Sequence, residues 1–124
     1  MGADLFILDT VDEVSDDDVH ATYIALCHED IRPAPAVGRL VLFLNEVERL
    51  YPAPVDGDSV WASYPHLIST TSTILDFSRI RSGDALSVVR SLALELGFIV
   101  YEPSAPQVYR PGSGPPSAST IDSR

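Results

Sequence analysis

The sequence predicts an α+β fold, in which three helices pack on one face of a small, mostly antiparallel sheet. Short apolar or β-branched runs and stretches of helical periodicity follow one another in the order β-α-α-β-β-α-β-β. The strands are too few and too mixed for a doubly wound parallel sheet. A chain of 124 residues suits one hydrophobic core, and we place a single domain at residues 1–110.

The first strand and the first helix have clear signals. Residues 4–8 form a short apolar run that is typical of a strand. Ser15 then precedes Asp18 by three residues, with an apolar residue on either side, and this capping box predicts a helix that continues to about Glu29. Its apolar face would hold Val19, Tyr23, Leu26 and Cys27. We therefore expect Cys27 to be a small core residue.

Prolines bound the second helix. Pro35 suits the first turn of a helix, where its missing N–H costs nothing. The helix must stop near Tyr51, because Pro52 and Pro54 disfavour helical geometry in the residues before them. Between these limits the apolar residues recur at helical spacing: Leu40, Phe43, Leu44, Val47 and Leu50. Residues 52–59 are rich in turn-forming residues and predict a loop.

The second half of the domain returns to strands. The Thr-rich, β-branched run from Ile68 to Ser78 predicts one strand, and we consider a short partner at residues 60–62. Residues 82–84 open a third helix with an apolar stripe of Leu86, Val89, Leu92, Ala93 and Leu96.

The end of the third helix and the chain that follows complete the domain. Gly97 predicts a helix C-cap, accompanied by a hydrophobic contact of Phe98. Residues 98–101 predict a buried strand, with residues 107–109 as its hairpin partner. The tail at residues 111–124 is rich in Gly, Pro and Ser without apolar periodicity, and we expect it to be disordered.

Acidic residues dominate the first quarter of the chain. Nine of the 18 carboxylates lie in the first 30 residues, before the first basic residue, Arg32, and the formal net charge is −10. The electric field of so many negative charges repels nucleic acid and anionic membranes and attracts basic protein surfaces or metal cations. We therefore expect a protein partner with a basic surface, and neither nucleic acid nor membrane. The composition says nothing about the oligomeric state.

No motif for catalysis or cofactor binding stands out, so we expect a protein that is not an enzyme and needs no cofactor. His20, Cys27 and His28 are seven or eight residues apart on one helix, roughly 11 Å, which is too far for one metal ion. Asp56 and Asp58 begin like a calcium loop, but the later oxygen ligands are missing. We expect no metal site.

Two aromatic residues, Trp61 and Tyr64, follow the acids of the central loop. They either plug the edge of the core or serve as exposed anchors for a partner, and the sequence leaves both interpretations open. The candidate partner-binding residues are therefore Asp12, Glu13, Asp16, Asp17, Asp56, Asp58, Trp61 and Tyr64.

Cysteine usage and the N-terminus favour a cytoplasmic protein. Cys27 is the only cysteine, so no internal disulfide can form. The first residues lack the basic and long apolar regions of a secretory signal.

Several segments together resemble one group of bacterial proteins. These are Asp4-Leu5 at the start of a strand, Leu50-Tyr51-Pro52 at the end of a helix, residues 58–61, and the run from Leu94 to Pro103. The chain resembles small acidic actinobacterial and proteobacterial proteins in which a helix ends in an Ala-x-Glu-His-Gly-Leu-Val-like segment before an aromatic residue, Asp and Pro. Leu96 replaces the His of that pattern, and Glu102 replaces the Asp.

In size, acidity and lack of a catalytic signature the chain is also similar to immunity proteins that neutralise polymorphic bacterial toxins. That similarity implies a non-enzymatic cytoplasmic protein that blocks a basic toxin domain, for example a nuclease, through its acidic surface. Two other classes stay open. One is a small enzyme or metal-binding protein with a site assembled from His20, His28, His66 and acids, and the other is a generic protein-interaction adaptor.

Overall fold

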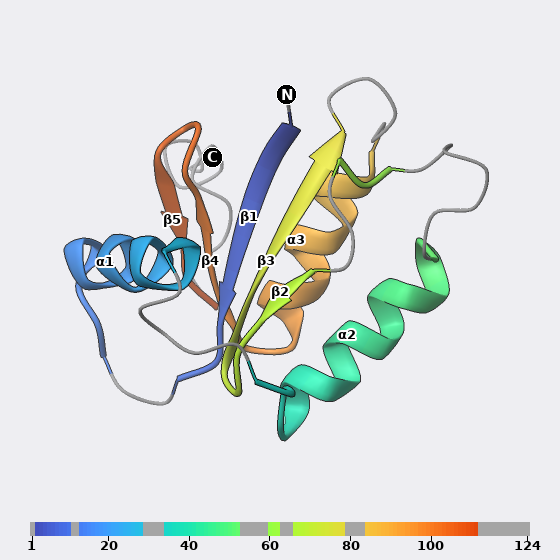
Figure 1. The fold of residues 1–124 in the computed structure, drawn as a ribbon, viewed down its shortest axis with the longest axis horizontal. Helices are drawn as coiled ribbons and strands as arrows, with labels where there is room; N and C mark the ends of the chain where they lie inside the picture. Colours follow the sequence, from blue (N-terminus) through green and yellow to red (C-terminus); the bar gives the residue numbers. More distant parts are fainter. Residues whose placement is uncertain are drawn as a thin grey trace, which may run out of the picture.

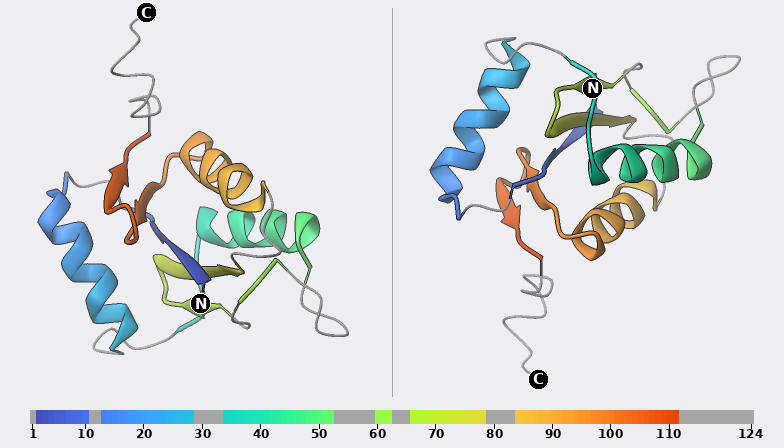
Figure 2. Two further views of the ribbon diagram at one scale, coloured as in Figure 1. Left: turned by 90° about the horizontal axis from the view of Figure 1, so that it is seen from above. Right: turned by 90° about the horizontal axis from the view of Figure 1, so that it is seen from below.

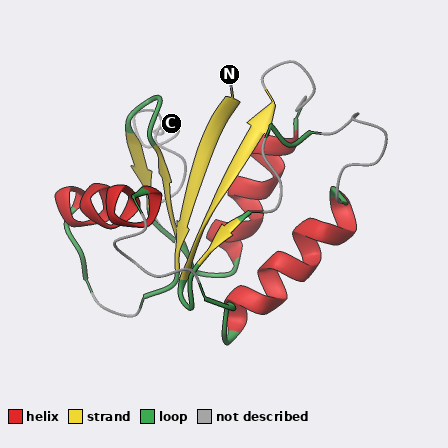
Figure 3. Cartoon of the chain, in the orientation of Figure 1, coloured by secondary structure: helices red, strands yellow, loops and turns green. Residues whose placement is uncertain are grey.

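The computed structural model describes residues 2–10, 13–28, 34–52, 60–62, 66–78 and 84–111. Within them the α+β class is confirmed, because three helices accompany one five-stranded sheet (Figures 1 and 3). The order of helices and strands is also as predicted, but both middle strands lie within residues 67–78, whereas the prediction placed them at residues 60–62 and 68–78. The elements are β1 (Gly2–Leu8), α1 (Asp16–Cys27), α2 (Arg39–Leu50), β2 (Leu67–Ile68), β3 (Ser72–Ser78), α3 (Ala85–Glu95), β4 (Ile99–Glu102) and β5 (Gln107–Tyr109).

The sheet is built around its first strand. The strand order is β2-β3-β1-β4-β5, and every pairing is antiparallel. All seven residues of β1 pair with β3, from Gly2 opposite Ser78 to Leu8 opposite Ser72. On its other side β1 pairs with β4 over three residues, from Phe6 opposite Tyr101 to Leu8 opposite Ile99. The N-terminal strand is therefore central rather than at an edge.

The helices cover both faces of the sheet, so the prediction of three helices on one face is wrong (Figure 2). Leu5 and Ile7 pack in a core cluster with α2 and α3, whereas Phe6 and Leu8 pack in a second cluster with α1. The reason lies in β1: a strand with consecutive buried side chains needs a cover on each face.

The first helix begins as predicted but ends sooner. Ser15 is its N-cap, and the Ser15 hydroxyl accepts a 3.1 Å hydrogen bond from the Asp18 backbone N–H. The helix ends at Cys27, two residues before the predicted Glu29. Cys27 is exposed, which corrects the prediction of a core cysteine. Leu26 takes the core position of that last turn, and the next residue is turned about 100° away from it.

The second helix begins four residues later than Pro35, so Pro35 is not in its first turn. Its N-cap is Gly38, whose φ of +64° is one that glycine adopts without strain. The preceding segment instead lies against the end of β2, where the Ala34 N–H donates to the Ile68 carbonyl and the Val37 N–H to the Thr70 carbonyl, each at 3.0 Å. This segment covers the outer edge of the sheet.

The run from Ile68 to Ser78 contains a turn rather than one continuous strand. The Ser69 N–H donates to the Ser72 carbonyl at 2.8 Å, and the hydroxyls of the two serines are 2.6 Å apart. Such local bonds compete with an extended backbone, so β2 and β3 form a hairpin. The expected partner at residues 60–62 is a single antiparallel bridge, between Trp61 and Phe77.

The end of α3 follows its sequence signals. Gly97 has a φ of +92°, the Phe98 N–H donates to the Ala93 carbonyl at 3.0 Å, and the Gly97 N–H donates to the Leu94 carbonyl at 3.1 Å. This is the Schellman arrangement, and the buried Phe98 supplies its hydrophobic contact. The β4–β5 hairpin is present as predicted. From residue 112 onward, the predicted tail lies outside the described residues.

Candidate functional site

The acidic residues at the start of α1 are exposed together. Glu13, Asp16, Asp17 and Asp18 all belong to the solvent-facing side of the segment. Arg110 forms an ion pair with Asp16, and within the described residues this is the only ion pair of the four. The helix N-terminus stabilises such acids, so their position has a structural reason as well. Asp12 lies outside the described residues.

Of the four candidate residues in and after the central loop, the structure describes one, Trp61. Asp56, Asp58 and Tyr64 lie outside the described residues. Trp61 is 5% exposed and belongs to the core cluster beneath α2 and α3. Its indole N–H donates to the Tyr51 carbonyl at 3.0 Å, and its ring centroid lies 4.8 Å from that of Phe77. Of the two roles that the sequence left open, Trp61 has the core role, so we remove it from the candidate binding surface.

The three histidines of the alternative site do not come together. His20 is on α1, where its Nδ1 lies 2.6 Å from the Tyr101 hydroxyl. His28 is the exposed C-cap of the same helix. His66 packs against Trp61 on the opposite side of the sheet, with ring centroids 4.4 Å apart, and burial lowers its pKa while the charge of Glu48 opposes that shift. The part of the chain that the structure describes contains no cluster of three or more groups able to hold a metal ion.

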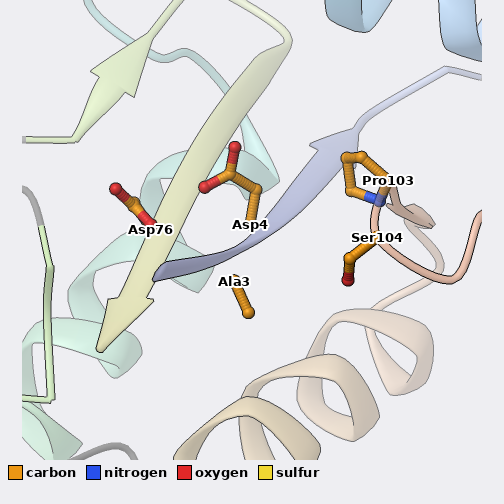
Figure 4. A pocket seen from close by; sticks show the side chains of 5 residues that line it. All are labelled: Ala3, Asp4, Asp76, Pro103 and Ser104. Carbon is orange, nitrogen blue, oxygen red and sulfur yellow. The ribbon is translucent and has the colours of Figure 1, made fainter. Parts of the chain in front are cut away.

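Sequence reasoning missed one polar cluster, formed by Asp4, Asp76 and Tyr23. Asp4 on β1 is directly opposite Asp76 on β3. The side chain of Tyr23 extends from α1 to the sheet, and its hydroxyl donates to Asp4 Oδ2 at 3.0 Å. Figure 4 shows the two carboxylates beside each other at a shallow pocket of about 380 Å³, which Pro103 and Ser104 of the β4–β5 turn also line.

The surroundings of Asp4 shift its protonation. The pKa of Asp4 is raised, chiefly by burial and then by a hydrogen bond with Asp76, while the bond from Tyr23 opposes the shift. The pKa of the Tyr23 phenol is also raised, first by burial and then by its bonds with Cys27 and Asp4. At neutral pH the phenol therefore acts as a hydrogen-bond donor. In the sequence, each aspartate is a single polar residue within a predicted strand. Only the pairing register of β1 and β3 places the two residues opposite each other.

The outer surface of α2 and α3 is more apolar than the sequence predicted. Leu50 and Leu96, expected on buried stripes, are exposed because they lie at the ends of the two helices. Leu50, Val88 and Leu92 line a shallow groove of about 400 Å³. Leu42, on the outer side of α2, is 66% exposed. This surface and the acidic start of α1 are on opposite faces of the sheet.

Comparison with protein-family models, curated proteins and solved structures finds no match to this chain. Among the described residues, none of the helices has both the length and the apolar character that a membrane span requires.

Proposed function

We propose that this protein binds a basic protein domain through its acidic face, defined as Glu13, Asp16, Asp17 and Asp18 together with the neighbouring Asp12. The observation that carries the proposal is the exposure of the four described carboxylates on one short segment, with a single ion pair to Arg110. The helix cap leaves the Asp18 carboxylate available, because the bond to Ser15 uses the Asp18 backbone N–H.

Electrostatics supports this class of partner. A formal net charge of −10 disfavours contact with another acidic surface, and a concentrated acidic face accelerates encounter with a basic one. Toxins that act on nucleic acids carry basic clefts for phosphates. An acidic protein that covers such a cleft would mimic the charge of the substrate and block access to it. We therefore propose a cytoplasmic immunity protein as the biological form of this binding activity.

The proposed role competes with two others. A small enzyme or metal-binding protein would need a constellation other than His20, His28 and His66, since these residues are dispersed in the fold. An adaptor would use the acidic face in the same way but without a toxin. The genes beside this one discriminate these roles: a toxin-like neighbour favours immunity, and a metabolic operon favours an enzyme.

The decisive experiment measures association with the protein encoded by the adjacent gene. In the acidic-face variant, Asp12→Asn, Glu13→Gln, Asp16→Asn and Asp17→Asn remove four charges. We expect slower association at low salt and a flatter salt dependence, because steering by exposed charges is screened by salt. The measurement is stopped-flow association from 50 to 500 mM salt, over which the Debye length falls from roughly 14 to roughly 4 Å.

A matched control removes the same number of charges from the opposite side of the sheet. It combines Glu46→Gln, Glu48→Gln, Asp84→Asn and Glu95→Gln on or beside α2 and α3. We expect it to change association much less than the acidic-face variant. Equal slowing in both variants would show that the net charge of the protein, and not the location of the charges on the acidic face, controls the association rate. Wild-type kinetics unaffected by salt would refute the proposal.

A further inference from the structure

We propose that the outer edge of β5 binds an extended basic segment of the partner protein, which adds to the sheet as a sixth strand and runs along the acidic face. The inference rests on the proposed function and specifies which part of a basic partner is recognised. In pairing of this kind, main-chain hydrogen bonds supply affinity and alternate side chains supply specificity.

The two edges of the sheet differ in their cover. β2 and β5 are the outermost strands. Beside β2 and the turn after it, residues 34–37 donate backbone hydrogen bonds to the Ile68 and Thr70 carbonyls, each at 3.0 Å. Beside β5, the described residues place no further strand and form no backbone–backbone hydrogen bond apart from the ladder with β4. A strand edge of this kind is a template for pairing with another chain.

The register identifies the backbone groups that the edge of β5 presents. In an antiparallel strand, the backbone groups of successive residues point to opposite sides. The Asp76 carbonyl accepts from the Ala62 N–H, on the side of β3 away from β1. Alternation through the paired residues of β3, β1 and β4 then makes Val108 the residue of β5 whose N–H and carbonyl point away from β4. The bond from Gln107 Nε2 to the Val108 carbonyl, at 3.3 Å, agrees with this orientation.

Arginine contacts hold β5 in place on both faces of the sheet. On the α3 side, Arg90 Nη1 lies 3.0 Å from Glu102 Oε1, and the guanidinium carbon lies 4.7 Å from the centre of the Tyr109 ring. On the α1 side, Arg110 forms an ion pair with Asp16. Contacts that order the edge before a partner arrives lower the entropy cost of pairing.

The acidic face lies beside this edge. The ion pair of Arg110 with Asp16 joins the end of β5 to the start of α1, and Figure 2 shows that end of the helix next to β5. A hollow of about 440 Å³ at this junction is lined by Glu13, Val14, Ser15 and Arg110. A strand added to β5 therefore passes the exposed carboxylates, and every second side chain of that strand is on their side of the sheet. Charge complementarity favours basic residues at those positions.

Charge also argues against a second copy of this chain as the occupant. Pairing two β5 edges would bring two acidic faces together, and each chain has a formal net charge of −10. Pro106 and Pro111 stand on either side of the edge and limit the length of the ladder, because proline has no N–H to donate. The edge therefore suits a short extended segment of a basic partner.

Hydrogen exchange of the full chain tests the pairing directly. The partner is the protein encoded by the adjacent gene, as in the association experiment. We expect the Val108 amide to exchange at least about tenfold more slowly in the complex than in the free protein, because pairing gives it a carbonyl acceptor. The amides of Ala34 and Val37, already bonded at the other edge, are the internal reference and should keep their protection. A Val108 amide that exchanges equally fast in the complex would overturn the inference.

Two substitutions at Val108 separate its backbone from its side chain. Val108→Pro removes the outward N–H and obstructs the added strand, while the matched control Val108→Ala shortens the side chain and keeps the N–H. Both variants lose apolar contact with the core cluster beneath α1, so their melting temperatures are compared first. We expect the partner to dissociate at least about tenfold faster from Val108→Pro than from Val108→Ala. Equal dissociation rates would contradict the inference, and the exchange measurement on the wild-type protein decides it if Val108→Pro does not fold.

The outcomes separate this inference from the proposed function. Slower association of the acidic-face variant, together with an unprotected Val108 amide in the complex, would overturn the inference alone. Wild-type association that salt does not affect would refute the proposed function and the inference with it. A Val108 amide that is already protected in the free protein would also overturn the inference. Protection that depends on protein concentration would then identify a second copy as the occupant, and protection that does not would identify residues 112–124 of the same chain.

Discussion

The Trp61 side chain combines two structural tasks at one position. Its rings fill the core cluster beneath α2 and α3, while its N–H satisfies the carbonyl of Tyr51 just beyond the end of α2. A buried indole needs such a hydrogen-bond partner, because an unsatisfied donor in the core is costly. The short 60–62 segment is thereby tied to both the second helix and β3.

Replacing Trp61 by Ala should cost about 3 to 5 kcal/mol of unfolding free energy, through lost burial and a cavity. Trp61→Phe keeps an aromatic ring but loses the bond to Tyr51, and it should cost less. Denaturant unfolding of the three proteins measures both effects. If Trp61→Ala were nearly as stable as wild type, the residue would not be the core element that its burial indicates.

The ends of the helices show how one long side chain can connect elements. Arg39, the first residue of α2, donates from Nη1 to the Leu96 carbonyl at 2.8 Å and from Nε to Asp9 Oδ1 at 2.9 Å. It thus joins the start of α2 to the end of α3 and to the residue after β1. The same guanidinium lies against Gly97, where a Cβ atom would come within 2.6 Å of Nη1.

Gly97→Ala should destabilise the protein for two reasons. The φ of +92° is strained for alanine by roughly 1 to 2 kcal/mol, and the new methyl group displaces the bound guanidinium of Arg39. In an Arg39→Leu background only the first cost should remain. A double-mutant cycle from urea unfolding measures the difference, and strict additivity would show that Arg39 and Gly97 are not coupled.

At the scale of the whole molecule, the sheet separates two surfaces of different character. The α1 side carries the acidic face and the Tyr23–Asp4 hydrogen bond, whereas the α2 and α3 side carries the apolar groove. Metal binding would be the simplest alternative use of so many acids. Their arrangement within the described residues gives no cluster suited to an ion.

Chelation should therefore leave the thermal stability unchanged. We expect the same melting temperature with and without excess chelator, and no stoichiometric metal in elemental analysis of the purified protein. A bound ion that chelator removes, with a large fall in melting temperature, would contradict this expectation, because a structural metal contributes its binding energy to folding.

The sequence by itself determined the order of the elements and most of their ends. These features depend on neighbours in the chain: the Ser15 cap, the stop after Leu50 before Pro52, and the Gly97 turn are local hydrogen bonds or backbone restrictions. For the same reason local reasoning located the exposed acids before and within the first turn of α1. It missed Gly38 as the start of α2, since the prolines before it gave a competing signal.

Only the tertiary structure decided which face each helix covers and which side chains meet across the sheet. The continuous apolar run in β1 is compatible with a strand that is buried on both faces. Whether both faces are buried depends on the position of β1 in the sheet, and the structure places it at the centre. The burial of Trp61 and the pairing of Asp4 with Asp76 depend on contacts between segments more than 15 and more than 70 residues apart in the sequence. Registers of that kind are fixed by the burial of whole layers, which no local pattern contains.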